Sequence, residues 1–263
     1  MNFETLNIEE SAPICRLTLN RPDSLNAMSS KMLRELVEAT QWFDSQSEIR
    51  VVIVRGAGRA FSAGADLKDP SRNDPAATWL ARREIAKAGS KMMDAIESMN
   101  AITIASVHGY AVGGAVLLIA ACDIRIATAD TRFSIPEIEL GIPLTWGGIP
   151  RLVRQIGPAM TKELVITCRE FTADEAKAIG FINRVVPPDE LAAHTTELAE
   201  KIVEMPAVPV AITKEHVNAV SRSIAGSTSY ADADVLMSSL AAPEGLDARK
   251  AYIERRLDRK REG

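Results

Sequence analysis

The stretch GYAVGGAVLLIAACDI, Gly109 to Ile124, places two adjacent glycines in front of a long apolar run. A run that is apolar on every side is typical of a fully buried helix. The N-terminus of a helix carries unpaired N–H groups and the positive end of the helix dipole, both of which favour negative charge. Gly113 and Gly114 therefore predict a helix start where a ligand can approach the main chain closely.

A second loop, FSAGADL at residues 61–67, places Gly64 between small residues directly after an expected strand. Glycine permits positive φ and exposes main-chain N–H groups. Neither loop matches a phosphate-binding pattern, because no Lys-Ser/Thr pair follows and Gly-x-Gly-x-x-Gly is absent. Each loop alone is also compatible with a simple turn or a tight helix contact. Together they suit an oxyanion hole, in which preorganised N–H groups stabilise charge that appears in the transition state.

Strands and helices alternate in the first half of the chain. β-branched apolar runs predict strands, and apolar residues at helical spacing predict helices, with Ser29 or Ser30 as the N-cap of the first. This order argues for parallel strands with right-handed crossovers. The expected strands are 14–19, 51–54, 101–107 and 123–128, and the expected helices are 29–43 and 78–99.

From Pro158 onward the pattern is helical. Thr172 before ADEA resembles a capping box, and Gly157 and Gly180 are typical helix stops. The expected helices are 158–168, 172–180 and 188–205, with two more up to Arg256.

Composition excludes several classes. The chain has 263 residues, a net charge of -4 and 46% hydrophobic residues, with Lys and Arg scattered evenly. This leaves no basic face for nucleic acid, and no apolar run approaches the ~20 residues that span a bilayer. We expect a cytoplasmic protein without a membrane or nucleic-acid partner. Cys15, Cys122 and Cys168 have apolar neighbours and no metal spacing, so we expect reduced, packed thiols.

The sequence resembles the crotonase superfamily of enoyl-CoA hydratases and isomerases. The resemblance covers essentially the whole chain. It rests on the ordered blocks LNRPDSLNAM, VRGAGRAFSAGADLK, ASVHGYAVGGAVLLIAACDIRIAT, FSIPEIELGIP, GGIPRL and FTADEAKAIGFINRVVP.

The resemblance implies an α/β fold, with a ββα spiral core over residues 1–195 and a C-terminal helical trimerisation region over 196–263. It further implies a homo-trimer, or a hexamer built from two trimers, and an acyl-CoA thioester as substrate. The segment GLDARKAYIERRLDRK is expected to help complete a CoA site, in the same or a neighbouring subunit. No metal or redox cofactor is implied, because CoA arrives as part of the substrate.

The resemblance also assigns site residues. The oxyanion hole would consist of the backbone N–H groups of Ala65 and Gly114. Ala63 would meet the adenine of CoA through its backbone. Leu25 to Ala27 would line the pantetheine and adenine pocket. Asp66 and Leu67 belong to the same expected substrate-binding loop, although Asp66 and Asp69 also suit loop and capping roles.

The proton shuttle departs from the commonest family pattern. Hydratases of this family pair two glutamates. Here Glu137 in SIPEIELGIP matches the second, but Leu117 stands where the first belongs. One carboxylate suffices to move a proton from carbon 2 to carbon 4 of a 3-enoyl-CoA, so isomerisation is favoured over hydration.

Several alternatives stay open. Glu139 would lie on the same face as Glu137 in an extended chain, and would then serve as a second acid; a solvent or subunit contact is the other interpretation. Trp146, after Thr145, either reshapes the acyl pocket or is an ordinary packed aromatic. His108 is expected to form a structural hydrogen bond. Hydration, hydrolysis or ring opening of a CoA thioester, and acyl-CoA binding without catalysis, remain alternative functions.

Overall fold

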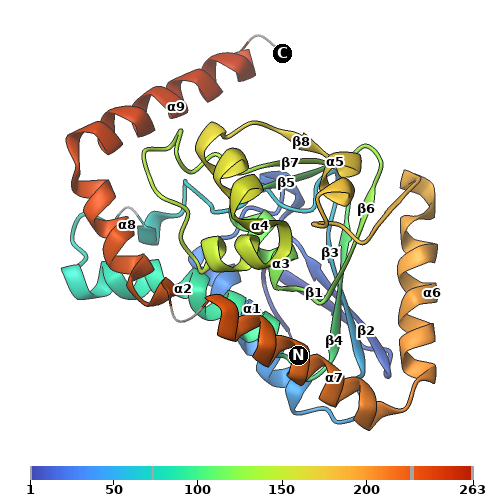
Figure 1. The fold of residues 1–263 in the computed structure, drawn as a ribbon. Coiled ribbons are helices and arrows are strands. Elements are labelled where there is room, and N and C mark those ends of the chain that lie inside the picture. Colours follow the sequence, from blue (N-terminus) through green and yellow to red (C-terminus); the bar gives the residue numbers. More distant parts are fainter. Residues whose placement is uncertain (1, 73, 226–227, 262–263) are drawn as a thin grey trace.

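Two β-sheets and their covering helices form the fold in this computed structural model, which describes residues 2–72, 74–225 and 228–261 (Figure 1). A six-stranded sheet has the order β1-β2-β3-β4-β6-β9, and a three-stranded sheet has the order β5-β7-β8. The strands of the larger sheet are Leu6–Glu9 (β1), Ile14–Leu19 (β2), Val51–Gly56 (β3), Ile102–Val107 (β4), Ile124–Thr128 (β6) and Arg184–Val186 (β9). Those of the smaller sheet are Tyr110–Val112 (β5), Arg132–Ser134 (β7) and Phe171–Thr172 (β8).

The pairing in the larger sheet confirms the expected parallel arrangement. The pairs β2·β3, β3·β4, β4·β6 and β6·β9 are parallel, and only β1 among the described strands of this sheet pairs antiparallel. The sequence patterns missed β1, β9 and all three strands of the smaller sheet. These strands have two to four residues, which is too short for a clear alternation.

The polypeptide passes between the two sheets within each repeating unit. β4 leads through Gly109, at φ +63°, into β5 and then α3, and β6 leads into β7 and later α4. This strand, strand, helix succession is the ββα spiral that the resemblance implied. It carries the end of β5 and the start of α3 to the boundary between the sheets.

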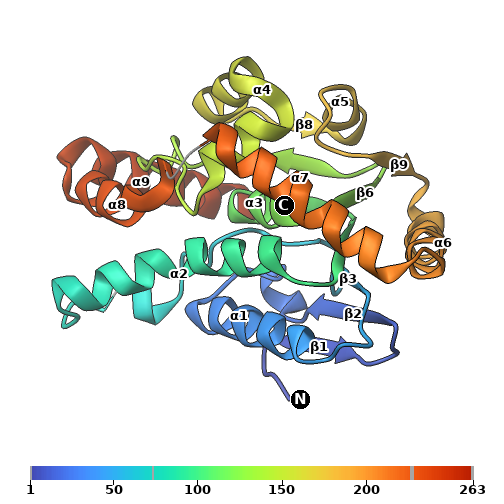
Figure 2. The ribbon, with the colours of Figure 1, turned by 60° about the horizontal axis from the view of Figure 1, so that its bottom comes forward.

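The helices are Ser30–Asp44 (α1), Trp79–Ser98 (α2), Gly114–Ala121 (α3), Gly148–Thr167 (α4), Ala173–Ala178 (α5), Leu191–Glu204 (α6), Ala207–Ala225 (α7), Asp232–Ala241 (α8) and Pro243–Arg261 (α9). Three helices follow α6 where the sequence predicted two. Figure 2 shows α1 and α2 on one side of the molecule, and α6 covers a face of the larger sheet.

Local signals at the helix ends are largely confirmed. The Ser29 side chain accepts a hydrogen bond from Met32 N, and Thr172 Oγ1 accepts one from Glu175 N. Gly180 follows α5 at φ +83°. Gly157 has the non-helical angles φ +75° and ψ 167°, so it ends the first helical stretch of α4 before Pro158, as expected of a helix stop. The sequence patterns missed that first stretch, residues 148–156.

Alternating residues of β3 serve two cores. Val52 and Val54 belong to the main hydrophobic cluster, whereas Val51 and Ile53 face the cluster covered by α6, which includes Ala199. α6 runs through the expected boundary at residue 195, and the division into a core and an oligomerisation region stays a prediction.

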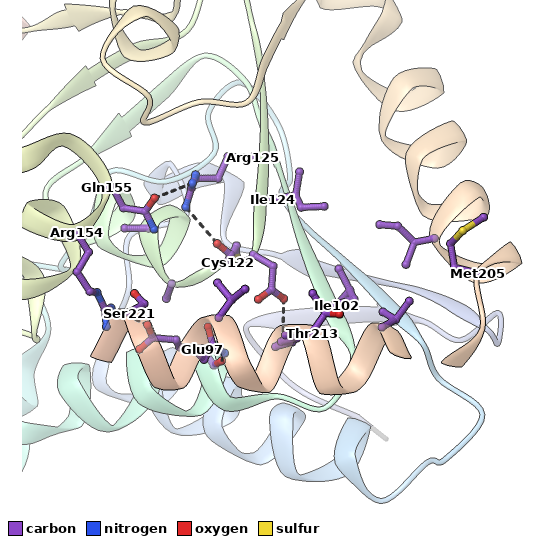
Figure 3. A pocket seen from close by; sticks show the side chains of 18 of the residues that line it. Glu97, Ile102, Cys122, Ile124, Arg125, Arg154, Gln155, Met205, Thr213 and Ser221 are labelled. Atoms are coloured by element: carbon purple, nitrogen blue, oxygen red, sulfur yellow. Dashed lines mark hydrogen bonds and ion pairs between the residues drawn. The ribbon is translucent and has the colours of Figure 1, made fainter. Parts of the chain in front are cut away.

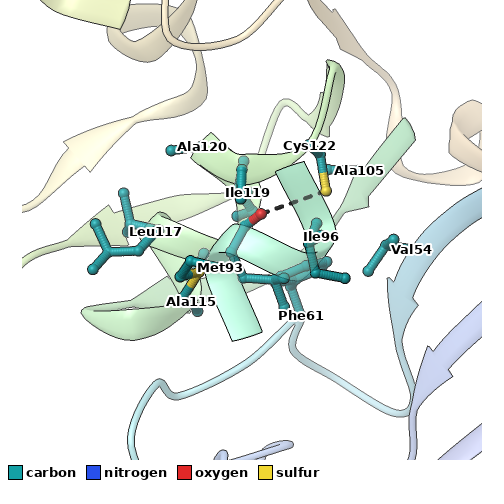
Figure 4. Close-up of a cluster of buried hydrophobic side chains, with 14 of the residues drawn as sticks. Val54, Phe61, Met93, Ile96, Ala105, Ala115, Leu117, Ile119, Ala120 and Cys122 are labelled. Atoms are coloured by element: carbon teal, nitrogen blue, oxygen red, sulfur yellow. Dashed lines mark hydrogen bonds between the residues drawn. The ribbon is translucent and has the colours of Figure 1, made fainter. Parts of the chain in front are cut away.

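All eight residues of α3 are buried, so the apolar run at its centre is a core helix as expected. Figure 4 shows this cluster, with Leu117 and Ile119 of α3 near Met93 of α2 and Phe61. The three cysteines are buried and free, which confirms packed thiols. Among the described residues, none of the helices is long and apolar enough to cross a membrane.

Candidate active site

The two glycine loops meet. A Cβ atom at Gly64 would lie 2.2 Å from the Val112 carbonyl oxygen and 3.2 Å from Gly114 N. Gly64 has φ +79° and Gly113 has φ +54°, a region that L residues rarely adopt. The glycines therefore allow a close main-chain approach that any side chain would prevent.

Two backbone donors remain available where the loops meet. Met28 N donates to Gly64 O at 2.7 Å, and Asp66 N donates to Met28 O at 3.0 Å. These two bonds form a bridge between Met28 and Ala65 that does not use the Ala65 N–H. Gly114 is the first residue of α3, and its N–H has no intrahelical acceptor. Neither group donates a backbone hydrogen bond to any residue that the structure describes. This is the arrangement that an oxyanion hole requires.

A small cavity of about 50 Å³ lies beside these donors. Its lining brings together five residues that the sequence analysis singled out, and Thr145. The complete lining is Ala65, Arg72, Gly114, Leu117, Glu137, Ile142, Leu144, Thr145, Trp146 and Leu236.

Glu137 supplies the carboxyl group of this small cavity. Its Oε1 lies against the backbone of Gly113, and its Oε2 is buried without a hydrogen-bond partner among the described residues. Burial raises the pKa of Glu137 to about 7, against a smaller lowering by its own backbone N–H. A carboxyl group with a pKa near neutrality can both accept and return a proton.

Glu139 does not share this environment. Leu140 N donates to both Pro136 O and Glu137 O, so the segment is a turn and the extended-chain premise is wrong. The Glu139 side chain is exposed, with Oε2 at 3.7 Å from Arg255 Nη2. The turn therefore directs the two glutamates to different surroundings.

Leu117 and Trp146 close the small cavity with apolar surface. The methyl groups of Leu117 pack against Gly148, and the ring of Trp146 packs against Gly114 and Gly89. A Cβ atom at Gly114 would lie 2.5 Å from Trp146 Cζ3. Trp146 is thus a packed aromatic that also lines the small cavity, and its effect on an acyl pocket stays a prediction.

Four expected substrate-binding residues form a connected loop cluster outside the small cavity. Ala63 N donates to Leu25 O at 2.8 Å, and Arg21 Nη1 contacts both Ala27 O and Asp66 Oδ2. The N–H of Ala63 is therefore engaged within the protein, and its expected backbone contact with an adenine stays a prediction. Asp66 also accepts from Lys68 N at 3.0 Å, which is the loop role that the sequence left open.

Asp69 and His108 have structural partners. Asp69 accepts a hydrogen bond from Ser30 N at the start of α1 and one from Ser71 N. Burial raises the pKa of Asp69, but hydrogen bonds from Ser30 and Ser71 outweigh this effect and bring it to about 2. His108 Nε2 lies 2.9 Å from Gly58 O, which confirms the expected hydrogen bond.

Part of the cavity lining has no counterpart among the residues predicted from the sequence. Leu236 comes from α8, in the region expected to serve oligomerisation, and Arg72 comes from the loop before α2. α8 is held over the site by the Arg83–Asp234 ion pair and by Gly147 N donating to Asp232 Oδ2. The sequence feature that could have indicated Arg72 is its position between Pro70 and Pro75, shortly after the glycine loop at residues 61–67.

A larger cavity of about 500 Å³, which we call the arginine-lined cavity, adjoins the small one through Arg72, Ile142 and Leu236. Leu67, an expected substrate-binding residue, and Arg249 of α9 line it. Arg249 lies in the segment expected to help complete a CoA site. Side chains of that segment beyond Arg255 lie outside the described part of the chain.

A further cavity of about 760 Å³ lies elsewhere, beneath α7. Figure 3 shows Glu97, Arg125, Arg154 and Gln155 lining it, with Arg125 donating to Gln155. Lys214 Nζ donates to Asp123 Oδ2 at 2.7 Å in the same wall. None of its lining residues belongs to the donor loops or to the small cavity.

A ββα spiral in which two residues with free backbone N–H groups and a buried carboxyl group line one cavity defines an enzyme of the crotonase superfamily. Solved structures agree with this class. An enoyl-CoA hydratase/isomerase from Xanthobacter autotrophicus Py2 superposes with a TM-score of 0.86 at 29% identity, over 98% of this chain and 99% of the other. An enoyl-CoA hydratase from Bacillus anthracis gives a TM-score of 0.77 at 30% identity, over 96% and 97%.

Sequence comparisons identify the family. Residues 9–260 match the profile described as enoyl-CoA hydratase/isomerase. The short-chain-enoyl-CoA hydratase of Clostridium acetobutylicum is 33% identical over 97% of both chains. The mitochondrial Delta(3,5)-Delta(2,4)-dienoyl-CoA isomerase of Rattus norvegicus is 34% identical over 83% of this chain and 69% of its own. This chain belongs to the enoyl-CoA hydratase/isomerase family and is an enzyme that acts on acyl-CoA thioesters.

Proposed function

We propose that this enzyme moves the double bond of a 3-enoyl-CoA thioester to the 2-position, with Glu137 as the single acid and base. One observation carries the proposal: Glu137 is the only carboxylate among the described residues that line the small cavity. Leu117, which cannot carry a proton, lines the same cavity. A hydration that needs two cooperating carboxylates therefore lacks one of them.

The chemistry follows from the groups around the thioester. The Glu137 carboxylate removes a proton from carbon 2, and electrons move onto the carbonyl oxygen. The N–H groups of Ala65 and Gly114 stabilise this enolate oxygen. The protonated Glu137 then returns the proton at carbon 4, the carbonyl reforms, and the new double bond joins carbons 2 and 3. A pKa near 7 suits both halves of this transfer.

Hydration of a 2-enoyl-CoA is the second candidate. The relatives named enoyl-CoA hydratases, at about one-third identity, favour it. It requires a second proton-transfer group or a water positioned by other groups, because the turn at Glu139 directs that side chain to the surface.

The experiment compares isomerisation of 3-hexenoyl-CoA with hydration of crotonyl-CoA by the purified protein. We expect clear isomerisation and weak hydration by the wild type. Glu137→Gln should reduce isomerisation by roughly 10²–10⁴-fold, the usual contribution of general acid–base assistance. Glu139→Gln is the matched control and should keep the wild-type rate.

Three outcomes would overturn the proposal. Efficient crotonyl-CoA hydration by the wild type would favour hydration. Release of free CoA thiol or of a ring-opened acid from a wider thioester panel would identify hydrolysis or ring opening. Acyl-CoA binding without any turnover would favour a binding protein. A trimeric or hexameric assembly and a cytoplasmic location stay predictions.

A further inference from the structure

The side chain of Arg72 has buried donors that no described residue of the protein uses. Its Nε and Nη2 atoms are inaccessible to solvent, and neither has a hydrogen-bond partner among the described residues. Burying a cation without a partner is costly, so such a group calls for an explanation.

Other buried arginines of this protein do not share this condition. Arg125, Arg151 and Arg154 each leave Nε without a partner, but each engages Nη2 with a side-chain oxygen. Of the arginines that the structure describes, Arg72 is the one that leaves both Nε and Nη2 buried without a partner.

These two nitrogens form one edge of the guanidinium group, which is the edge that binds a carboxylate in a bidentate manner. Arg83 shows this geometry in the same chain. Its Nε lies 2.6 Å from Asp234 Oδ1, and its Nη2 lies 2.8 Å from Asp234 Oδ2. The edge that Arg83 uses for a carboxylate is therefore the edge that Arg72 leaves unused.

The guanidinium is held in position by its surroundings. Its Cζ lies 5.3 Å from the centroid of the Trp146 ring, a cation–π distance. Burial lowers the pKa of Arg72, while the carboxylates of Asp69 and Asp66 raise it. Both carboxylates bind other groups: Asp69 accepts from Ser30 N, and Asp66 pairs with Arg21. Neither carboxylate forms a hydrogen bond with Nε or Nη2 of Arg72.

The location of Arg72 indicates which part of a substrate it meets. It lines the small cavity together with Glu137, Ala65 and Gly114, and it also lines the arginine-lined cavity with Arg249. In a CoA thioester, the whole pantetheine arm separates the phosphates from the thioester carbonyl. An anion next to the oxyanion hole therefore belongs to the acyl group.

We propose that Arg72 binds a carboxylate at the far end of the acyl group, so that the substrate is the CoA monothioester of an unsaturated dicarboxylic acid. This inference rests on the proposed function for the site of the thioester, but not on which reaction follows. Arg72 is then a specificity-determining residue.

Binding of two saturated thioesters tests the proposal independently of catalysis. Glutaryl-CoA and valeryl-CoA have the same number of acyl carbons, and only glutaryl-CoA ends in a carboxylate. Charge-assisted hydrogen bonds predict that the wild type binds glutaryl-CoA roughly 10–100-fold more tightly by calorimetry. Arg72→Met should remove this preference and leave the affinity for valeryl-CoA within about threefold of the wild type.

Two further variants control the experiment. Arg82→Met removes an exposed arginine of the arginine-lined cavity and should keep the preference. Arg72→Lys keeps the charge without the planar edge, so the preference should fall while valeryl-CoA binding persists. Arg72→Lys decides the question if Arg72→Met does not fold.

Three results would overturn the inference. The first is equal affinity of the wild type for both thioesters. The second is an equal loss of both in Arg72→Met, which would assign Arg72 to the CoA moiety. The third is tight valeryl-CoA binding only with added acetate, which would show that Arg72 takes a separate anion. A preference for glutaryl-CoA without isomerisation of any 3-enoyl-CoA would leave this inference standing and refute the proposed reaction alone.

Discussion

The carboxyl group of Glu137 lies directly over the backbone of Gly113, so that a Cβ atom on Gly113 would be 2.6 Å from Glu137 Oε1. Gly113 precedes the free N–H of Gly114, and Gly113 N itself donates to Ser134 O at 2.8 Å. The proposed acid–base group and one proposed oxyanion donor are thus adjacent in space, although more than twenty positions separate them in sequence. This proximity lets both groups act on one thioester.

Removing the Gly114 donor should slow the reaction strongly. Gly114→Pro deletes the N–H, and loss of one oxyanion donor typically costs about 10²–10³ in kcat. Gly114→Ala keeps the N–H but introduces a similar clash with Trp146. We therefore expect kcat of the proline variant to fall roughly 10²–10³-fold below that of the alanine variant. Equal rates in the two variants would remove Gly114 N–H from the mechanism.

The reaction should depend on pH through Glu137. The proposed base must be ionised, and burial raises its pKa to about 7. Below that pH the carboxylate fraction falls, so kcat/KM should drop about tenfold per pH unit and level off on the alkaline side. A rate profile across this range measures it. A flat profile well into the acidic range would contradict Glu137 as the base.

The same shift predicts how stability depends on pH. The native state holds the Glu137 proton more tightly than the unfolded chain, so this stabilisation is full below pH 4.5 and is lost as pH rises to about 7. Glu137→Gln does not titrate there. As pH rises from 4.5 to about 7, its free energy of unfolding should therefore increase relative to that of the wild type by up to about 3 kcal/mol. Urea titrations measure this difference, and parallel pH dependences of the two proteins would contradict a raised pKa of the buried Glu137 carboxyl.

Restoring a second carboxylate should restore hydration. Leu117 and Glu137 line the same cavity, so Leu117→Glu introduces an acid opposite the existing one. We expect crotonyl-CoA hydration to rise at least about tenfold over Leu117→Gln, which has the same shape without an ionisable group. If both variants gain equally, better water access rather than proton transfer is responsible.

Lys214 should be important for stability rather than catalysis. Its buried Nζ donates to Asp123 Oδ2 and to Ala101 O, which ties α7 to the larger sheet. Lys214→Met leaves the Asp123 carboxylate without its cation and should cost about 3 kcal/mol in free energy of unfolding. Lys214→Met combined with Asp123→Asn should recover part of this loss. An unchanged denaturant midpoint in the single variant would contradict the prediction.

The sequence alone determined the family, the parallel strand order and the position of the two glycine loops. These features are local: β-branched runs specify strands, and glycine pairs specify where the main chain is exposed. The change from glutamate to leucine at Leu117 was also visible, because it needs only the position within a recognisable block. Glu137 was identified in the same way.

Tertiary structure decided the surroundings of these residues. The turn after Pro136 separates Glu139 from Glu137, the fold buries Glu137 enough to raise its pKa, and α8 brings Leu236 to the cavity. Arg72 looked like any other polar loop residue, because its lack of a partner is a property of the groups packed around it. Burial and hydrogen bonding depend on segments distant in the chain, so they emerge only when the fold assembles them.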